Sequence, residues 1–458
     1  MRNVTEAPAV GAARRLSRAS WIALGLAGLL VAGCLLVGYV LVRTGHKLHQ
    51  GNVWILHARW SLQLGPALLL SIAVAAAAVA YAPRLAASLP WRRLRWAAYA
   101  AAVVWPVSLA LSDGLAGLSR PLASPYEYVH DVHRVHSVHD LLGGFAGRIL
   151  DLPHGEPWTS HVSGHPPGVF AVFVALDRIG LAGPLWAGLF CVVVGAAVAP
   201  LVLSTVRVLG DETAARRAAP YVVFAPAALW IASSADAMFA GVAAAGICAL
   251  AHAAVRRDRT GDLLAVAGGL ALGGCLFLSY GLTLLAPIAA AVVLVRRRIR
   301  PLVIAAATAL AVVLAVAVAG FNWWEGLGLT AERVRTGSAW IIRPTPYFWF
   351  VNLADVAIVV GPAVIAALPL MRPGRPWRLP ARTSESDLVV WTSVAALAAI
   401  GLAIASNLSK GEVERIYLPF AVWLLPLARL LPQRDTRIWL AVQTGMAVLL
   451  EALLQTRW

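Results

Sequence analysis

The chain has 458 residues, of which 60 % are hydrophobic and 13 % are charged, a composition too apolar for a water-soluble globular protein. Its formal net charge is +16, and arginine supplies nearly all of it because lysine occurs only at positions 47 and 410. In a polytopic membrane protein such arginines mark cytoplasmic loops. The charge therefore indicates topology, and we expect no nucleic-acid partner.

Hydrophobic runs that could cross a bilayer recur along the chain. A spanning helix needs about 20 apolar residues, and about thirteen such runs are present. The first, near residues 20–42, follows an arginine-containing N-terminus and is too long for a removed signal peptide, so we expect a retained helix. Residues 167–182 are too short for a full span, which favours a re-entrant or tilted piece. The sequence thus predicts an all-α, multi-pass protein of the plasma membrane.

Arginine clusters alternate with the predicted spans and assign the two sides of the membrane. The predicted cytoplasmic loops contain Arg84, Arg92, Arg93, Arg95, Arg207, Arg216, Arg217, Arg256, Arg257, Arg259, Arg296, Arg297, Arg298, Arg300, Arg372, Arg375, Arg378, Arg382, Arg434 and Arg437. The complementary outer segments are residues 44–60, 113–165, 233–236, 279–281, 321–350 and 406–415. The outer segments hold nearly all the histidines, so we expect the chemistry on the extracytoplasmic side.

The outer loop 113–165 contains three candidate catalytic carboxylates. Asp113 stands at a membrane boundary, where a carboxylate is costly unless it has a partner or a function. Glu127 lies between two tyrosines, and Asp131 follows four residues later. We expect residues 126–142 to form a juxtamembrane helix on the outer surface, with Glu127 and Asp131 on one face. Which of the three carboxylates acts as a base stays open.

Four histidines recur at every third position of this loop, at residues 130, 133, 136 and 139. Each step of three residues turns by about 300° on an α-helix, so the four side chains cannot all bind one ion. His130 and His133 could hold a divalent metal together with a carboxylate, and no other cofactor is indicated. The competing interpretation is a solvated helix with one or two histidines turned toward a cavity.

Three motifs resemble those of the polytopic GT-C glycosyltransferases, the class that includes bacterial aminoarabinose transferases and protein mannosyltransferases. "PYEYVHDV" at 125–132 is similar to the acidic motif of their first large outer loop, although the Asp-Glu pair typical of that motif is absent. "GHPPG" at 164–168 resembles their "HPPL" element. "GEVERIYLPF" at 411–420 resembles the element that opens a late helix. The turns at 233–239 and 279–287 occupy comparable positions.

The resemblance covers most of the chain from residue 113 onward. It implies a GT-C-like transmembrane catalytic module over residues 96–458, with the outer loop 113–165. Residues 1–95 are then expected to form additional N-terminal transmembrane helices.

The implied activity is an inverting transfer of a sugar from a polyprenyl-phosphate donor to an extracytoplasmic glycan, lipid or protein acceptor. A carboxylate would accept the proton of the acceptor hydroxyl, with Glu127 favoured over Asp113. The leaving phosphate needs fixed positive charge. The candidates for this role are Arg415 and, as assisting groups, Arg343, His165 and Lys410. The candidates for lining the cavity are Tyr126, Tyr128, His130, His133, Asp236, Tyr280, Tyr347, Glu412 and Tyr417.

A polytopic transporter or flippase of lipid-linked or small solutes is the alternative function. Such proteins commonly have related halves with broken helices, whose polar residues meet near the membrane midplane. The sequence has no convincing internal repeat and its polar residues crowd one side, which favours an enzyme. Asp355 lies within an apolar run, where pairing with Arg343 and lining the cavity are both open.

Overall fold

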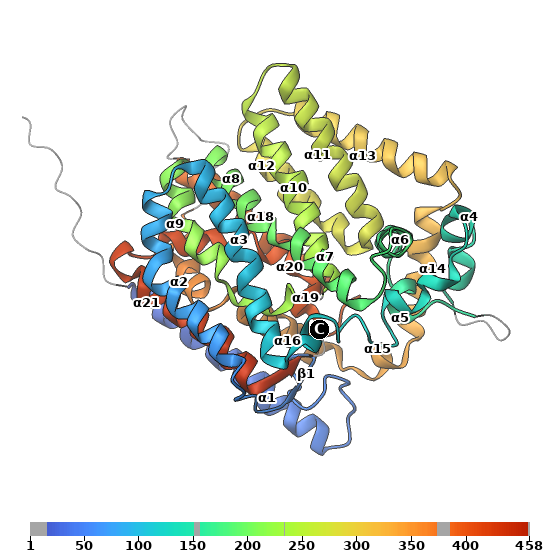
Figure 1. Ribbon diagram of the computed structural model, residues 1–458, viewed down its shortest axis with the longest axis horizontal. Helices are drawn as coiled ribbons and strands as arrows, with labels where there is room; N and C mark the ends of the chain where they lie inside the picture. Colours follow the sequence, from blue (N-terminus) through green and yellow to red (C-terminus); the bar gives the residue numbers. More distant parts are fainter. Residues whose placement is uncertain (1–15, 151–155, 233, 373–384, 457–458) are drawn as a thin grey trace, which may run out of the picture.

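The computed structural model describes residues 16–150, 156–232, 234–372 and 385–456, and this part of the chain forms a bundle of helices (Figure 1). Eight helical segments of the described residues are long and apolar enough to cross a membrane. They are α1 (Arg18–Arg43), α2 (Leu68–Ser88), α3 (Trp91–Ala110) with η1 (Leu111–Asp113), α7 (Pro184–Ala196) with α8 (Val198–Leu209), α10 (Ala235–Val255), α11 (Arg259–Leu278), α13 (Arg300–Val318) and α18 (Glu385–Ser406). The predicted helical, multi-pass architecture is confirmed to this extent.

The predicted number of spans is not found in the described residues. A ninth span is counted only if α16 (Thr345–Val360) is joined to the bent segment that follows it. Other apolar runs form shorter, broken or less apolar helices, namely α6 (Pro167–Arg178), α9 (Glu212–Val223), η5 (Pro226–Trp230), η6 (Tyr280–Leu285), α12 (Ala286–Leu294), α20 (Leu418–Ala421), η9 (Leu425–Leu430) and α21 (Thr436–Leu453). Prolines divide several of these runs, because proline removes a helical hydrogen bond and fixes φ.

Helix α6 bears out the interpretation of residues 167–182 as less than a full span. It has 12 residues and is therefore only about 18 Å long. Smaller elements connect the spans. They are η2 (Leu115–Leu118), η3 (Tyr128–Arg134), α4 (Val138–Leu142), η4 (Ala146–Arg148), α5 (Ser160–Ser163), α14 (Trp323–Thr336), α15 (Ser338–Ile342), α17 (Pro362–Ala367), η7 (Leu368–Leu370), α19 (Val413–Ile416) and η10 (Gln433–Asp435).

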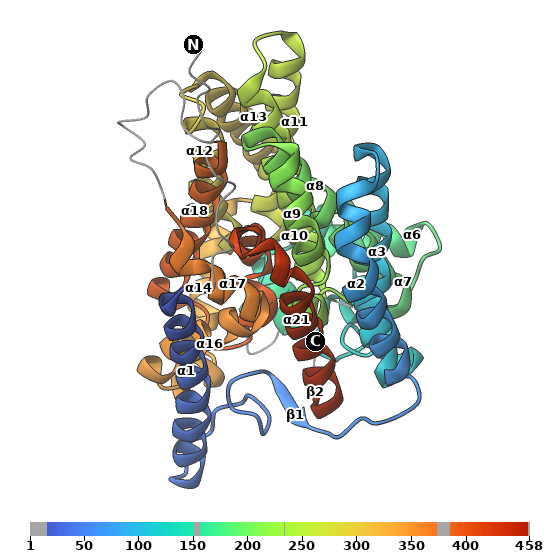
Figure 2. The same cartoon turned by 90° about the vertical axis from the view of Figure 1, so that its left-hand side faces the viewer.

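The helices surround α10, which is the most buried of the spans and contacts α11, α7 and α8. Helices α1 and α13 lie at the periphery (Figure 2), where large apolar side chains such as Leu29 and Leu314 are exposed. Exposed apolar surface of this extent fits contact with lipid. The N-terminal helices are not separate from the rest, because α1 packs against α16 and α2 packs against α21.

A short two-stranded ribbon joins the loop between α1 and α2 to the C-terminal end of the described chain. Strand β1 (Ala58–Trp60) pairs antiparallel with β2 (Leu454–Thr456), with Arg59 opposite Gln455. The backbone N–H of Ser61 continues the pairing by donating to the carbonyl of Leu453. The ribbon therefore fixes the loop between α1 and α2 against the end of α21.

The predicted continuous juxtamembrane helix over residues 126–142 is wrong. The segment instead contains the 3₁₀ helix η3 and the five-residue helix α4. Ser137 separates them by starting α4, since its hydroxyl accepts from the N–H of Asp140, whose carboxylate accepts in return from the N–H of Ser137. This reciprocal cap fixes a new helix start inside the segment.

Helix α16 ends at a sharp break. Its axis and that of the segment Pro362–Leu370 differ by 98°, and Gly361 has a φ of 79°. Gln443 of α21 satisfies the broken backbone, because its Nε2 donates to the Val360 carbonyl at 2.7 Å and its Oε1 accepts from the Ala363 N–H at 3.0 Å. A side-chain amide thus replaces helical hydrogen bonds that membrane lipid could not supply.

We expect Gly361→Ala to lower the free energy of unfolding by about 1–3 kcal/mol, because this backbone conformation is almost confined to glycine. An added Cβ would also lie 2.5 Å from Gln443 Oε1. Unfolding of the detergent-purified protein by heat or by sodium dodecyl sulfate measures the effect. Gly401→Ala is the matched control, since nothing lies within 4 Å of the added methyl group. Equal stability of the two variants would contradict the prediction.

Candidate functional site

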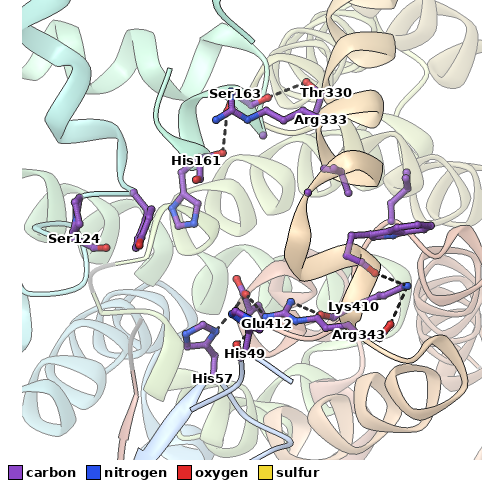
Figure 3. A pocket seen from close by; sticks show the side chains of 18 of the residues that line it. His49, His57, Ser124, His161, Ser163, Thr330, Arg333, Arg343, Lys410 and Glu412 are labelled. Carbon is purple, nitrogen blue, oxygen red and sulfur yellow. Dashed lines mark hydrogen bonds and ion pairs between the residues drawn. The ribbon is translucent and has the colours of Figure 1, made fainter. Parts of the chain in front are cut away.

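A large cavity lies where the outer segments meet (Figure 3). Its volume is about 1280 Å³. The lining residues come from segments that are far apart in the sequence, at 49–59, 120–126, 150, 160–164, 330–343, 408–412 and 455–456. Four of the outer segments expected from the arginine distribution supply most of this lining. Their convergence supports the prediction that they share one side of the membrane.

Charged and imidazole groups make up much of the polar lining. The lining includes the cationic side chains Arg59, Arg120, Arg333, Arg343 and Lys410, the histidines His49, His57 and His161, and the carboxylates Glu332 and Glu412. Cations outnumber carboxylates, so the cavity favours an anionic ligand. Of the residues predicted for the site, those in the lining are Tyr126, Arg343, Lys410 and Glu412.

A chain of polar groups lies behind the wall at His161. The Nδ1 atom of His161 is 2.6 Å from Glu127 Oε1, and Arg415 Nη2 is 3.3 Å from His161 Nε2. Arg415 also donates through Nη1 to Asp236 Oδ2 at 2.6 Å. Glu127, Asp236 and Arg415 are buried, with at most 5 % of each exposed. Glu127 and Arg415 are therefore close together, with His161 between them. The sequence also predicts that Asp113, Glu127, His165 and Arg415 share one outer cavity, but none of the four is among the residues that line it.

Local hydrogen bonds hold the Glu127 turn against α5. The N–H of His161 donates to the Tyr126 carbonyl at 3.0 Å. The Asp131 carboxylate accepts from the N–H of Thr159 at 2.7 Å and from Arg134 Nη1 at 2.9 Å. Asp131 is thus committed to joining η3 to the start of α5, and it does not line the cavity. We therefore assign it a positioning role in place of the predicted catalytic one.

Asp113 and Asp355 also lie outside the cavity lining. Asp113 forms an ion pair with Arg120, whose own side chain is in the lining. Asp113 therefore acts on the cavity only through Arg120. Asp355 is fully buried, and among the described residues neither of its oxygens has a hydrogen-bond partner. The expected pairing of Asp355 with Arg343 is wrong, because Arg343 pairs with Glu412 instead. The expected place of Asp355 in the cavity lining is wrong as well.

Glu412 is the centre of a second group of charges at the cavity. It lies 3.3 Å from His57 Nδ1, 3.1 Å from Arg343 Nη2 and 3.8 Å from Arg415 Nη2. Burial would raise the pKa of Glu412, but the hydrogen bond from His57 and the charges of its neighbours hold the pKa well below its usual range. Glu412 is therefore ionised at neutral pH and links the cavity wall to Arg415.

Arg343 and Lys410 use most of their donors on the protein itself. Arg343 donates to the carbonyls of Leu48, His49 and Lys410 and to the Glu412 carboxylate. Lys410 Nζ donates to the carbonyls of Trp340 and Arg343. A guanidinium has five N–H groups and an ammonium three, so these contacts leave about one donor on each for a ligand.

His165 lies behind the wall and not in the lining. Its Nδ1 is 2.9 Å from both the Tyr128 hydroxyl and the His161 carbonyl. Burial lowers the pKa of His165 to about 4, although the charge of Asp236 opposes this shift. A neutral imidazole gives a phosphate no positive charge. We therefore assign His165 and Tyr128 to supporting the wall in place of the predicted phosphate-binding and lining roles.

The three remaining tyrosines predicted for the lining are buried in the core. Tyr280 packs against the Trp323 ring, and Tyr417 packs against Phe420. The Tyr347 hydroxyl donates to the carbonyls of Cys34 and Trp54. None of these tyrosines is among the residues that line the cavity.

The four regularly spaced histidines are all exposed, and none of them lines the cavity. The expectation that one or two of them face the cavity is therefore wrong. His130 Nε2 lies 3.2 Å from the Ala123 carbonyl, a contact with backbone and not with a second metal-binding side chain. No group of three or more His, Cys, Asp or Glu side chains among the described residues is arranged to hold a metal ion. The histidines fit the solvated interpretation.

We expect replacement of His130, His133, His136 and His139 by alanine to change the free energy of unfolding by no more than about 0.5 kcal/mol. Any transfer activity should also stay within twofold of the unmodified protein, and a chelator should have no effect on it. Unfolding and activity of the quadruple variant, each measured with and without chelator, test this. A loss of activity with chelator that metal restores, and that the quadruple variant lacks, would assign a metal to these histidines.

The sequence interpretation missed His161, which is the histidine closest to the candidate base. The available signal was its position four residues before His165, next to the "GHPPG" motif. It also missed Arg333, which donates to the carbonyls of Ile149 and Trp158. Arginines that bind loop carbonyls carry no local motif, so only the folded chain identifies them.

The scan against protein-family models gives no match, and the search of curated proteins gives no significant match. The geometry of the cavity and the three motifs are therefore the features that bear on function.

Proposed function

We propose that the protein is a glycosyltransferase of the plasma membrane that moves a sugar from a polyprenyl-phosphate donor to an extracytoplasmic glycan, lipid or protein. The observation that carries the proposal is the pair formed by His161 and Glu127 at the wall of a cationic cavity. A base, a site for an anion and a lipid-facing helical bundle are the parts that this reaction needs.

The His161 and Glu127 pair acts as the general base in this mechanism. The Glu127 carboxylate, 2.6 Å from His161 Nδ1, orients the imidazole as a carboxylate does in hydrolases. The Nε2 atom then takes the proton of the acceptor hydroxyl, and its long contact with Arg415 gives way. The carboxylate stabilises the imidazolium that forms. This assignment keeps Glu127 essential but places His161 as the group that faces the acceptor.

Arg343 and Lys410 receive the phosphate. The acceptor oxygen attacks the anomeric carbon, the bond from that carbon to the phosphate oxygen breaks, and polyprenyl phosphate leaves as an anion. Each cation offers its remaining N–H to this anion, where charge develops in the transition state. Arg415 adds positive charge from behind the wall. Burial lowers the pKa of Arg415, but the charges of Asp236, Glu127 and Glu412 outweigh burial and raise it above its ordinary value.

The test is a reaction of the purified protein with synthetic polyprenyl-phosphate hexoses and pentoses in the presence of delipidated cell-envelope glycan. Mass spectrometry should detect polyprenyl phosphate released in step with sugar transferred. His161→Ala is the control that should release none. Activity with a nucleotide sugar and not with any polyprenyl-phosphate sugar would contradict the proposal.

Transport of a lipid-linked or small solute is the second candidate, and the break between α16 and α17 favours it. Broken helices line substrate paths in many transporters. Asp355, which lies in α16, is also a buried carboxylate without a hydrogen-bond partner among the described residues. Movement of a labelled lipid-linked sugar across liposomes that contain the protein, without chemical change, would support this candidate over the first.

A further inference from the structure

A second cavity lies between α3 and α8, away from the site described above. Its volume is about 440 Å³, and its lining consists of Arg92, Arg95, Trp96, Tyr99, Ala197, Pro200 and Leu201. These α3 residues belong to the first turns of the helix. The opposite end of α3 leads to Asp113 and its partner Arg120 in the lining of the large cavity. The second cavity therefore lies at the arginine-rich end of the bundle.

The lower part of this second cavity is apolar and fixed in shape. The Tyr99 hydroxyl donates to the Val193 carbonyl of α7 at 3.0 Å, and the Trp96 ring packs edge-on against Tyr99 at 6.3 Å between centroids. Opposite these rings, the junction of α7 and α8 contributes only Ala197, Pro200 and Leu201. Aliphatic side chains on one wall and aromatic rings on the other form an apolar cavity, and its volume of about 440 Å³ leaves room for an aliphatic chain.

The upper part carries two exposed arginines whose charge the protein does not balance. Neither Arg92 nor Arg95 forms an ion pair with a carboxylate of the described residues. The neighbouring carboxylate Glu212 is already shared by Arg207 at 2.8 Å and Arg216 at 2.6 Å. Two unbalanced guanidinium groups above an apolar cavity match a ligand with an anionic head and a hydrocarbon tail.

We propose that this cavity is a binding site for an anionic phospholipid of the leaflet at the arginine-rich end. The phosphate lies between Arg92 and Arg95, and one acyl chain lies along Trp96, Tyr99 and Leu201. Tryptophan and tyrosine prefer the depth at which headgroups meet acyl chains. Anionic lipids concentrate in the cytoplasmic leaflet, where basic pockets between helices bind their headgroups. The site is independent of the proposed glycosyl transfer.

Native mass spectrometry of the detergent-purified full chain, titrated with phosphatidylglycerol or phosphatidylcholine, tests this proposal. The double variant R92A/R95A should retain phosphatidylglycerol about 30-fold more weakly than the unmodified protein, from about 1 kcal/mol for each arginine. R84A/R93A is the matched control, because it removes the same charge from exposed arginines at the same end that do not line the cavity. It should retain phosphatidylglycerol as the unmodified protein does.

A variant that fills the apolar part separates a lipid site from a site for free phosphate. Ala197→Phe should weaken retention of phosphatidylglycerol by tenfold or more, and inorganic phosphate alone should not compete with the lipid. Equal losses in R92A/R95A and R84A/R93A would show general surface attraction and overturn the proposal. Retention of phosphatidylcholine as strong as that of phosphatidylglycerol, or competition by inorganic phosphate, would also overturn it. Thermal unfolding of each variant in detergent checks that the chain is folded.

Discussion

Glu127→Gln should lower the rate of sugar transfer by about 100- to 10,000-fold, the usual contribution of a general base, and leave donor affinity nearly unchanged. The amide keeps the shape of the carboxylate, but it cannot stabilise a positive charge on His161, 2.6 Å away from it in the unmodified protein. Rates under single-turnover conditions and binding of a radiolabelled donor measure the two effects separately. A loss of donor binding equal to the loss of rate would indicate that Glu127 acts through structure.

Variants of the other two candidate carboxylates serve as comparisons for Glu127→Gln. Asp113→Asn should cost less activity, because Asp113 reaches the cavity only through its ion pair with Arg120. Asp131→Asn should lower stability and activity together, since the carboxylate accepts from the N–H of Thr159 at the start of α5. If Asp113→Asn abolishes transfer and Glu127→Gln does not, Asp113 is the base and the turn at 125–128 is scaffolding.

His161→Gln completes the set. Glutamine is polar and of similar size, but it cannot take a proton at neutral pH. We expect the transfer rate of His161→Gln to fall as far as that of Glu127→Gln. The rate of the double variant should be no lower than that of either single variant, because the effects of residues that act as a unit are not additive. Losses that multiply in the double variant would mean that the two side chains act separately.

The sequence was sufficient to assign to one side four of the segments that meet at the cavity. The described residues of 233–236 and 279–281, assigned to the same side, do not line it, and residues 455–456 were not expected there. Arginine position reports the side of the membrane, because moving positive charge outward during insertion is unfavourable. The assignment of segments to one side does not require a correct count of the spans. The arginine distribution therefore placed 44–60, 113–165, 321–350 and 406–415 on one side, although the first and last of these segments lie near opposite ends of the chain.

The number of spans and the roles of single residues could not be predicted in the same way. An apolar run predicts burial in lipid or protein, but it does not tell a full span from a short helix that other helices enclose. Runs such as the one around Pro419 lie inside the bundle, where Leu418 and Phe420 are buried. The regular spacing of the four histidines led to a wrong expectation about the cavity. They repeat every three residues, but all of them lie on the surface.

Partners of charged residues are set by tertiary contacts that the sequence does not encode locally. Arg343 and Arg415 both resemble anion-binding arginines when only sequence is available. In the fold, Arg343 joins three loop carbonyls, whereas Arg415 pairs with Asp236, 179 residues away. The motif at 411–420 drew attention to Arg415, but it did not indicate that this arginine pairs with Asp236.

Arg415→Met should lower the free energy of unfolding by about 3–5 kcal/mol, because removal of one partner from a buried ion pair leaves the other charge uncompensated. The Arg415 and Asp236 side chains are only 6 % and 4 % exposed, so water cannot solvate an unpaired Asp236. Unfolding by sodium dodecyl sulfate, followed by tryptophan fluorescence in detergent, measures the loss. A decrease below about 1 kcal/mol, typical of surface pairs, would contradict the buried geometry.

The double variant R415M/D236L separates the structural from the chemical role of this pair. With both charges removed, stability should recover most of the loss, since buried pairs replaced by apolar groups of similar volume are often neutral. Transfer activity should not recover, because Arg415 also contacts His161 and contributes positive charge behind the phosphate site. Recovery of both stability and transfer would show that Arg415 serves only to hold α19 against α10, and the phosphate would then depend on Arg343 and Lys410 alone.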